Sequence, residues 1–69
     1  MSLGDKILLL CKYHGITEKQ LAILTGINVN QISRYINSDT DPRASSILKI
    51  ADALGVSTDY LLREEQEHD

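Results

Sequence analysis

Between Asn28 and Asn37 the chain carries a run of side chains that can donate and accept hydrogen bonds, NVNQISRYIN. If this run is helical, Ile32, Tyr35 and Ile36 share one face at i, i+3 and i+4 and point inward. The opposite face then presents Val29, Asn30, Gln31, Ser33 and Arg34. This outward set suits hydrogen-bonded recognition of a partner. The alternative is an ordinary solvated surface, since exposed polar residues are common on short helices.

Local signals place this face on the second of two short helices. Thr17 begins a helix, because Gln20 three residues later completes a T-x-x-Q capping box. Gly26 supplies the backbone freedom for a tight turn, and Asn28 caps the next helix, which ends near Asn37. Two helices joined by a short glycine-containing turn describe the DNA-binding helix-turn-helix, in which the second helix enters the major groove.

Apolar periodicity predicts three further helices around this pair. The first covers about residues 3–13, the fourth covers residues 44–54, and the fifth is capped by Ser57. Residues 37–43, NSDTDPR, form a loop. No segment reads as a strand, so the fold class is all-α. The residues expected to face the core are Leu3, Ile7, Leu10, Cys11, Leu21, Ala22, Leu24, Ile47, Ile50, Ala51 and Leu54. Tyr60, Leu61 and Leu62 are expected to supply apolar bulk on the fifth helix. Gly4, Gly15, Gly26 and Gly55 are each expected to lie where one helical segment stops or another begins.

Charge is unevenly distributed along the 69 residues, whose net charge is −3. Residues 1–63 hold seven Lys and Arg against six Asp and Glu, and the other four acids lie in residues 64–69. We therefore expect one folded domain over residues 1–63 and an acidic, disordered tail over residues 64–69. The alternative is a tail that mimics phosphate. A negative total is unusual for a nucleic-acid binder, but without the tail the body is +1.

Several functional classes lack support in the sequence. A single cysteine excludes an internal disulfide, and neither a leader peptide nor an apolar segment of about 18 residues is present, which favours a cytoplasmic protein with no membrane association. Cys11 and His14 lie i, i+3, but no further ligands follow at metal spacing. Paired carboxylates and a glycine-rich phosphate loop are also missing, so we expect no enzyme, no metal and no cofactor.

Several segments together resemble a known family. TEKQLA, TGINVNQISRY, PR and LKIADALGVSTDYLL stand at the spacing of the five-helix domain of phage repressors and Cro proteins, the Xre family. The resemblance covers nearly the whole chain. It implies a compact five-helix, lambda-repressor-like bundle with the helix-turn-helix at its second and third helices. It also implies a transcriptional repressor that binds a palindromic DNA operator as a homodimer, without a small-molecule effector.

The resemblance also assigns roles to individual positions. Val29, Asn30 and Arg34, with Gln31 and Ser33 beside them, correspond to positions that reach base edges. Their chemistry is suitable, since Arg can bridge guanine O6 and N7, Asn or Gln can pair with adenine, and Val can contact a thymine methyl. The positions that correspond to DNA-backbone contacts are Lys19, Gln20, Asn37 and Arg43.

The chain departs from the family pattern at several positions. Glu18 replaces a usual Gln, and Asp39 and Asp41 stand where Lys or Arg is frequent, which should weaken non-specific DNA affinity. Ser38 replaces the usual glycine after the third helix, so Asn37 is expected in the left-handed conformation.

Another departure concerns the core. Cys11 and Ile36 occupy the positions of an Arg and Glu that form a buried ion pair in many members. Replacing a buried pair by packed apolar groups is often neutral or stabilising. We therefore expect Cys11 and Ile36 to touch in the core.

Two questions stay open at the level of sequence. The alternative function is a protein-interaction module, such as an antitoxin-like helix-turn-helix protein that binds a partner protein. The dimer surface is expected near residues 60–63, with the end of the loop before the fourth helix. Its alternative is the first helix, where Leu8 and Leu9 widen the apolar surface.

Overall fold

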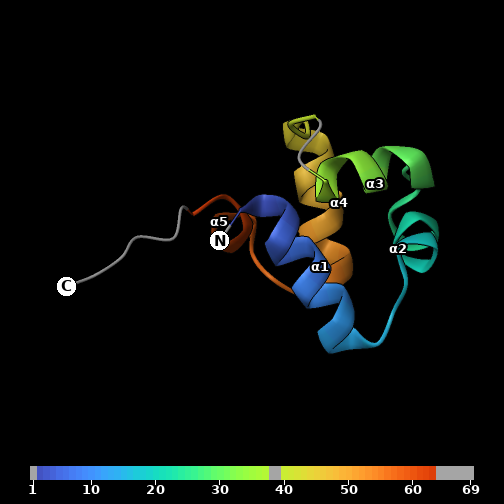
Figure 1. Ribbon diagram of the computed structural model, residues 1–69. Coiled ribbons are helices and arrows are strands. Elements are labelled where there is room, and N and C mark those ends of the chain that lie inside the picture. The colour runs from blue at the N-terminus through green and yellow to red at the C-terminus, as the bar shows by residue number, and fades with distance from the viewer. Residues whose placement is uncertain (1, 38–39, 64–69) are drawn as a thin grey trace.

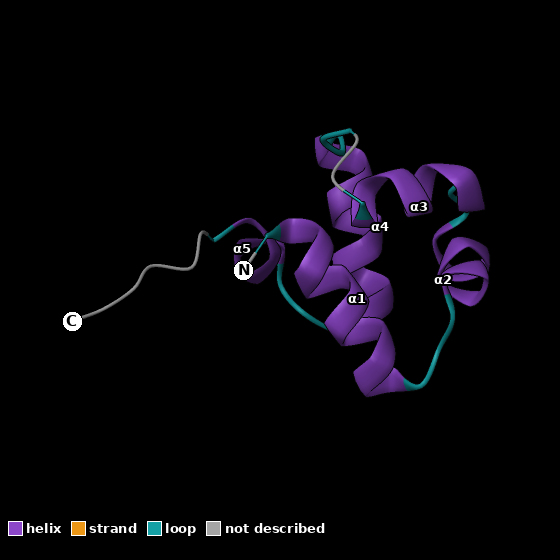
Figure 2. Ribbon diagram, viewed as in Figure 1, coloured by secondary structure: helices purple, strands orange, loops and turns teal. Residues whose placement is uncertain are grey.

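The computed structural model describes residues 2–37 and 40–63. Its five helices are α1 (Leu3–His14), α2 (Glu18–Thr25), α3 (Val29–Ile36), α4 (Ala44–Leu54) and α5 (Thr58–Leu62). Figure 2 shows only helices and loops in this part of the chain, which confirms the predicted all-α class. None of these helices is long and apolar enough to cross a membrane. The predictions for Ser38, Asp39 and the acidic tail over residues 64–69 lie outside the described residues.

Side-chain caps begin the helices of the predicted helix-turn-helix. The Thr17 N–H donates to Gln20 Oε1 at 2.8 Å, and the Gln20 N–H donates to Thr17 Oγ1 at 3.1 Å, which confirms the capping box. Asn28 Oδ1 accepts a hydrogen bond of 2.8 Å from the Asn30 N–H at the start of α3. Between the two helices, Gly26 adopts φ +74°, the left-handed conformation that the turn requires. Local sequence therefore fixes where α3 begins.

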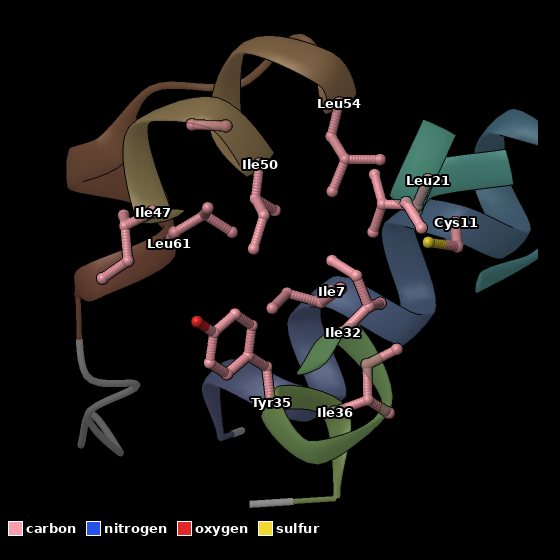
Figure 3. Packing of buried hydrophobic residues seen from close by; sticks show 12 residues of the cluster. Ile7, Cys11, Leu21, Ile32, Tyr35, Ile36, Ile47, Ile50, Leu54 and Leu61 are labelled. Carbon is pink, nitrogen blue, oxygen red and sulfur yellow. The ribbon is translucent and has the colours of Figure 1, made fainter. Parts of the chain in front are cut away.

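The helices enclose one apolar core. In Figure 1, α1 and α4 cross near the centre, α2 and α3 lie together on one side, and α5 lies beside the start of α1. Figure 3 shows Ile7, Ile32 and Ile50 pointing toward one another from α1, α3 and α4. Every helix contributes to the fully buried side chains, which are Ile7, Leu21, Ile32, Ile50, Leu54 and Leu61. The inner side of α3 therefore packs against a core to which every helix contributes, and this packing supports its outward face.

Gly4 lies in the first turn of α1, where the glycine pattern predicted the beginning of a segment, and it is buried. A Cβ atom on Gly4 would stand 2.1 Å from the carbonyl oxygen of Ile36, the last residue of α3. The start of α1 therefore packs backbone to backbone against the end of α3. The other three glycines confirm the prediction, because each follows the last residue of a helix.

The apolar face of α2 differs from the predicted one. Leu24 was expected inside but is 60% exposed, and Thr25 is buried in its place. Thr25 Oγ1 donates to the carbonyl oxygen of Leu21 at 2.8 Å and accepts from the Ile27 N–H at 3.2 Å. A hydroxyl can satisfy backbone groups where a helix ends and a leucine cannot, which explains why threonine occupies the inner position.

The apolar residues of α5 divide between the core and the surface. Leu61 is buried, whereas Tyr60 and Leu62 are exposed. The α5 helix has only five residues, which is little more than one turn, and Leu61 is its buried residue. Asn37 has φ −88°, so the prediction of a left-handed conformation at this residue is wrong.

Lys6 is a buried charged residue whose role the sequence did not predict. Its side chain is 4% exposed, and its ammonium donates to the carbonyl oxygens of Tyr60, at 3.0 Å, and Arg63. The ammonium also lies 5.4 Å from the centre of the Tyr60 ring, within the range of a cation–π interaction. Lys6 therefore joins α1 to the end of α5 by satisfying carbonyl groups that a helix leaves open.

His14 makes the corresponding connection at the other end of α1. Its Nε2 lies 2.8 Å from the carbonyl oxygen of Leu54, the last residue of α4. The two polar side chains thus connect opposite ends of α1 to the ends of α5 and α4.

Cys11 and Ile36 are both buried in the core cluster, which agrees with their place at two positions where many family members have a buried Arg–Glu ion pair. Direct contact between the two side chains stays a prediction. Burial, and secondly the nearby Glu18 carboxylate, raise the pKa of the Cys11 thiol. The thiol therefore stays protonated at neutral pH and serves as a small apolar group rather than a nucleophile.

Candidate nucleic-acid interface

The outward face of α3 is held in place by the residues on its inner side. Ile32, Tyr35 and Ile36 are buried, as predicted, and Tyr35 Oη lies 3.2 Å from Ser46 Oγ of α4. The opposite side of the helix is consequently turned to solvent. Of the five residues predicted there, Val29, Asn30 and Arg34 are exposed, whereas Gln31 and Ser33 are half-buried.

Two hollows flank the start of α3. The first, here called the α2-side hollow, is lined by Lys19, Ala22, Ile23, Gly26, Ile27, Asn28 and Val29. The second, here called the α4-side hollow, is lined by Ile27, Asn28, Gln31, Tyr35, Arg43, Ser45, Ser46 and Lys49. Both contain Ile27 and Asn28, so they meet at the turn that leads into α3. The first turns of α3 therefore stand as a ridge between two depressions.

Positive charge gathers around this ridge. Lys19 lines one hollow, Arg43 and Lys49 line the other, and Arg34 is exposed on α3 itself. No acidic residue lines either hollow in the part of the chain that the structure describes. The negative total charge of the chain thus conceals a local surface that can attract a polyanion.

The residues expected to contact the DNA backbone, Lys19, Gln20, Asn37 and Arg43, are all exposed. Two of them are partly engaged within the protein. Gln20 Oε1 accepts from the Thr17 N–H, so its amide nitrogen remains to donate. Asn37 Nδ2 donates to Ser33 Oγ at 3.4 Å. The structure brings Lys19 and Arg43 to opposite sides of the start of α3, where each could reach a phosphate.

Lys49 is the residue that sequence reasoning missed. It lies three and four positions after Ser46 and Ser45 on α4, and side chains at these spacings share one helix face. The signal was present in the sequence, but which face of α4 turns toward α3 depends on the packing.

Among the described residues, no group of three or more potential metal ligands lies close together.

Comparison with known proteins identifies this arrangement. The family model described as helix-turn-helix matches residues 9–61. The chain belongs to the helix-turn-helix family. Its match includes α2 and α3 with most of the supporting bundle, which confirms the resemblance to the phage-repressor and Cro type.

One curated relative of this helix-turn-helix chain is the HTH-type transcriptional regulator ImmR of Bacillus subtilis (strain 168). The two are 35% identical over 66 residues, which cover 96% of this chain and 52% of ImmR. The chain therefore spans about half the length of the curated relative it matches.

Solved structures of similar proteins share the fold. The crystal structure of the P22 c2 repressor with synthetic operator 9T matches with a TM-score of 0.86 and 30% identity, over 91% of this chain and 96% of that one. The solution structure of the P22 c2 DNA-binding domain matches with a TM-score of 0.86 and 31% identity, over 90% of this chain and 82% of that one. The crystal structure of a transcriptional regulator from Listeria innocua matches with a TM-score of 0.80 and 24% identity, over 97% of this chain and 63% of that one. At this identity the match supports a common fold only.

Proposed function

We propose that this chain is a sequence-specific DNA-binding regulator, acting as a repressor, that places α3 in the major groove of its operator. The observation that carries the proposal is the exposed face of α3 between two hollows, of which one is lined by Lys19 and the other by Arg43 and Lys49. A ridge of this kind can enter a groove while the flanking cations meet phosphates on both sides. Membership of the helix-turn-helix family and the operator-bound P22 c2 repressor support the same function.

The exposures of the outward side chains divide their proposed roles. Val29, Asn30 and Arg34 extend from α3 into solvent and are proposed to contact base edges. Gln31 and Ser33 are half-buried and would reach only the bases nearest the helix. The proposed backbone contacts are Lys19, Gln20, Asn37 and Arg43. Such a regulator acts in the cytoplasm and needs no catalysis, cofactor or small-molecule effector.

Selection of bound sequences from a random pool of DNA duplexes, at moderate salt, tests this function. We expect enrichment of a defined motif with two-fold symmetry. If no motif is enriched, the family's alternative role as a protein-interaction module replaces the proposal. The chain would then be an antitoxin-like protein, and the protein that it binds would be sought.

Arginines at different positions are expected to affect binding differently. Arg34→Ala should cost about 1–3 kcal/mol on the enriched duplex and relax the preference at one base pair, because a bidentate contact to a base is lost. Arg43→Ala should instead weaken binding to all sequences alike, because a phosphate contact carries no base information. Dissociation constants on the enriched duplex and on single-base variants distinguish the two. A uniform loss for Arg34→Ala would contradict its assigned role.

We propose that two copies associate through the face formed by α4 and α5. This face holds an apolar hollow lined by Ala44, Ile47, Leu48, Thr58 and Leu62. Leu48 and Leu62 are 62% and 58% exposed, more than Leu8 and Leu9 on α1, at 39% and 50%. An exposed apolar patch of this kind is typical of a protein–protein contact. Dimerisation would double the short stretch of bases that one α3 can read.

Replacing Leu62 by serine is expected to weaken both self-association and operator binding while leaving the fold intact, because the side chain is exposed in the single chain. Sedimentation measures the monomer–dimer equilibrium, and circular dichroism checks the fold. Leu9→Ser on α1 is the matched control. A larger effect of the control would move the dimer surface to α1.

A further inference from the structure

Two basic residues, Arg43 and Lys49, line the α4-side hollow, and the proposed DNA contacts include only Arg43. It encloses about 400 Å³ and lies between the inner edge of α3 and the first turns of α4. Arg43, at the start of α4, already has a proposed phosphate contact. Lys49 lines the same hollow from about 1.7 turns further along the helix, and no role has been given to it.

The surroundings of Lys49 favour an anionic ligand. Ser45 and Ser46 line the hollow on the same face of α4, and Asn28 and Gln31 line it from α3. Hydroxyl and amide groups can donate to an oxyanion beside the ammonium. None of the described residues that line the hollow is acidic, so its lining adds no negative charge beside Arg43 and Lys49.

The hollow also has a fixed base. Tyr35 is 6% exposed, and its hydroxyl lies 3.2 Å from Ser46 Oγ, so a contact between two lining residues of the hollow connects α3 to α4. A ligand held between Arg43 and Lys49 would consequently be held at a constant position relative to α3. An ammonium is a point charge without the planar fork of a guanidinium, so Lys49 suits an isolated phosphate better than a base edge.

We infer that Lys49 is a DNA-backbone contact that, together with Arg43, binds a phosphate diester in the α4-side hollow. This inference rests on the proposed function and adds a residue to it. The bound phosphate lies beside Gln31, and it sets the depth and register at which α3 enters the major groove. Lys49 is thus a positioning residue, which contributes affinity for every sequence and preference for none.

The salt dependence of binding tests the role of Lys49. Lys49→Gln removes the charge and keeps most of the side chain, Lys49→Arg keeps the charge, and Lys12→Gln on α1 is the matched control, an exposed lysine outside both hollows. Dissociation constants are measured between 50 and 200 mM salt on two 30-base-pair duplexes, one enriched by selection and one of arbitrary sequence. Thermal unfolding of each variant checks that the fold is kept.

Loss of one phosphate contact makes the slope of log K against log salt shallower by about 0.9, so the deficit of Lys49→Gln should shrink about 3.5-fold across this range. The same change is expected on both duplexes, and Lys49→Arg should restore the wild-type slope. A Lys49→Gln slope equal to that of Lys12→Gln, with wild-type binding intact, would overturn the inference alone. Absence of salt-dependent binding by the wild type would overturn the proposed function, and the inference with it.

Discussion

Replacing Gly4 by alanine is expected to destabilise the domain by about 3 kcal/mol and to lower its melting temperature by roughly 12–24 °C. The new Cβ would stand 2.1 Å from the Ile36 carbonyl oxygen and 2.9 Å from that of Tyr35. Both neighbours are backbone atoms, so α1 or the end of α3 must move. Helix propensity alone predicts the opposite sign, since alanine is about 1 kcal/mol better than glycine inside a helix. Urea denaturation followed by circular dichroism measures the difference.

Gly15→Ala is the matched comparison for this substitution. Gly15 has φ +69°, but a Cβ there would meet no atom within 4 Å. Its cost should therefore be only the left-handed backbone penalty of about 1–2 kcal/mol. A Gly4→Ala protein that is as stable as the wild type, or more stable, would show that α1 and α3 are further apart than the structure has them. The support for the recognition helix would then need revision.

Replacing Lys6 by methionine is expected to destabilise the domain by about 2 kcal/mol, because two charge-assisted hydrogen bonds to the end of α5 disappear. Methionine keeps the length and apolar stem of the side chain, so the loss isolates the ammonium. The α5 helix has five residues and cannot persist by its own propensity, and it is expected to loosen first. Hydrogen exchange of the α5 amides and thermal unfolding measure the two effects.

Lys12→Met serves as the control for Lys6. Lys12 lies on the same helix but is exposed, and surface substitutions usually change stability by less than about 0.5 kcal/mol. Equal losses for the two variants would mean that the Lys6 ammonium adds nothing to the connection between α1 and α5. Loss of α5 protection only in Lys6→Met would support it.

Much of the fold could be predicted from the sequence because its signals are local. The Thr17–Gln20 capping box, the turn at Gly26 and the Asn28 cap involve residues at most three positions apart. Ala44 and Leu54 bound α4 as predicted. These features depend on backbone groups that must be satisfied at every helix end, so residue type and spacing identify them.

The wrong or missing predictions depend on neighbours that are distant in sequence. In the sequence, Gly4 is explained by the start of a helix, and its close approach to the carbonyl of Ile36 depends on how α1 packs against α3. Lys6 has the sequence features of a surface lysine, because the carbonyl groups to which it donates belong to Tyr60 and Arg63, 54 and 57 residues away. The spacing of Leu24 is compatible with the core, but Thr25 is the buried residue because its hydroxyl serves the end of α2.

The candidate site shows the same division. The inward and outward faces of α3 followed from helical periodicity, because Ile32, Tyr35 and Ile36 are buried. Sequence alone did not show that Gln31 turns toward α4 or that Lys49 meets it there, since this depends on how two helices pack. The sequence also did not show that Lys19, Arg43 and Lys49 line hollows beside the start of α3, although the chain as a whole is negative.

The position of α3 in the major groove is tested most directly with duplexes in which the N7 atom of each purine is replaced in turn by a C–H group. Purine N7 is an acceptor in the major groove only, so the replacement leaves base pairing and the minor groove unchanged. We expect a loss of affinity of about 1–3 kcal/mol at a few purines of the enriched motif, and Arg34→Ala should become insensitive at one of them. Full affinity for every substituted duplex would contradict recognition through the major groove.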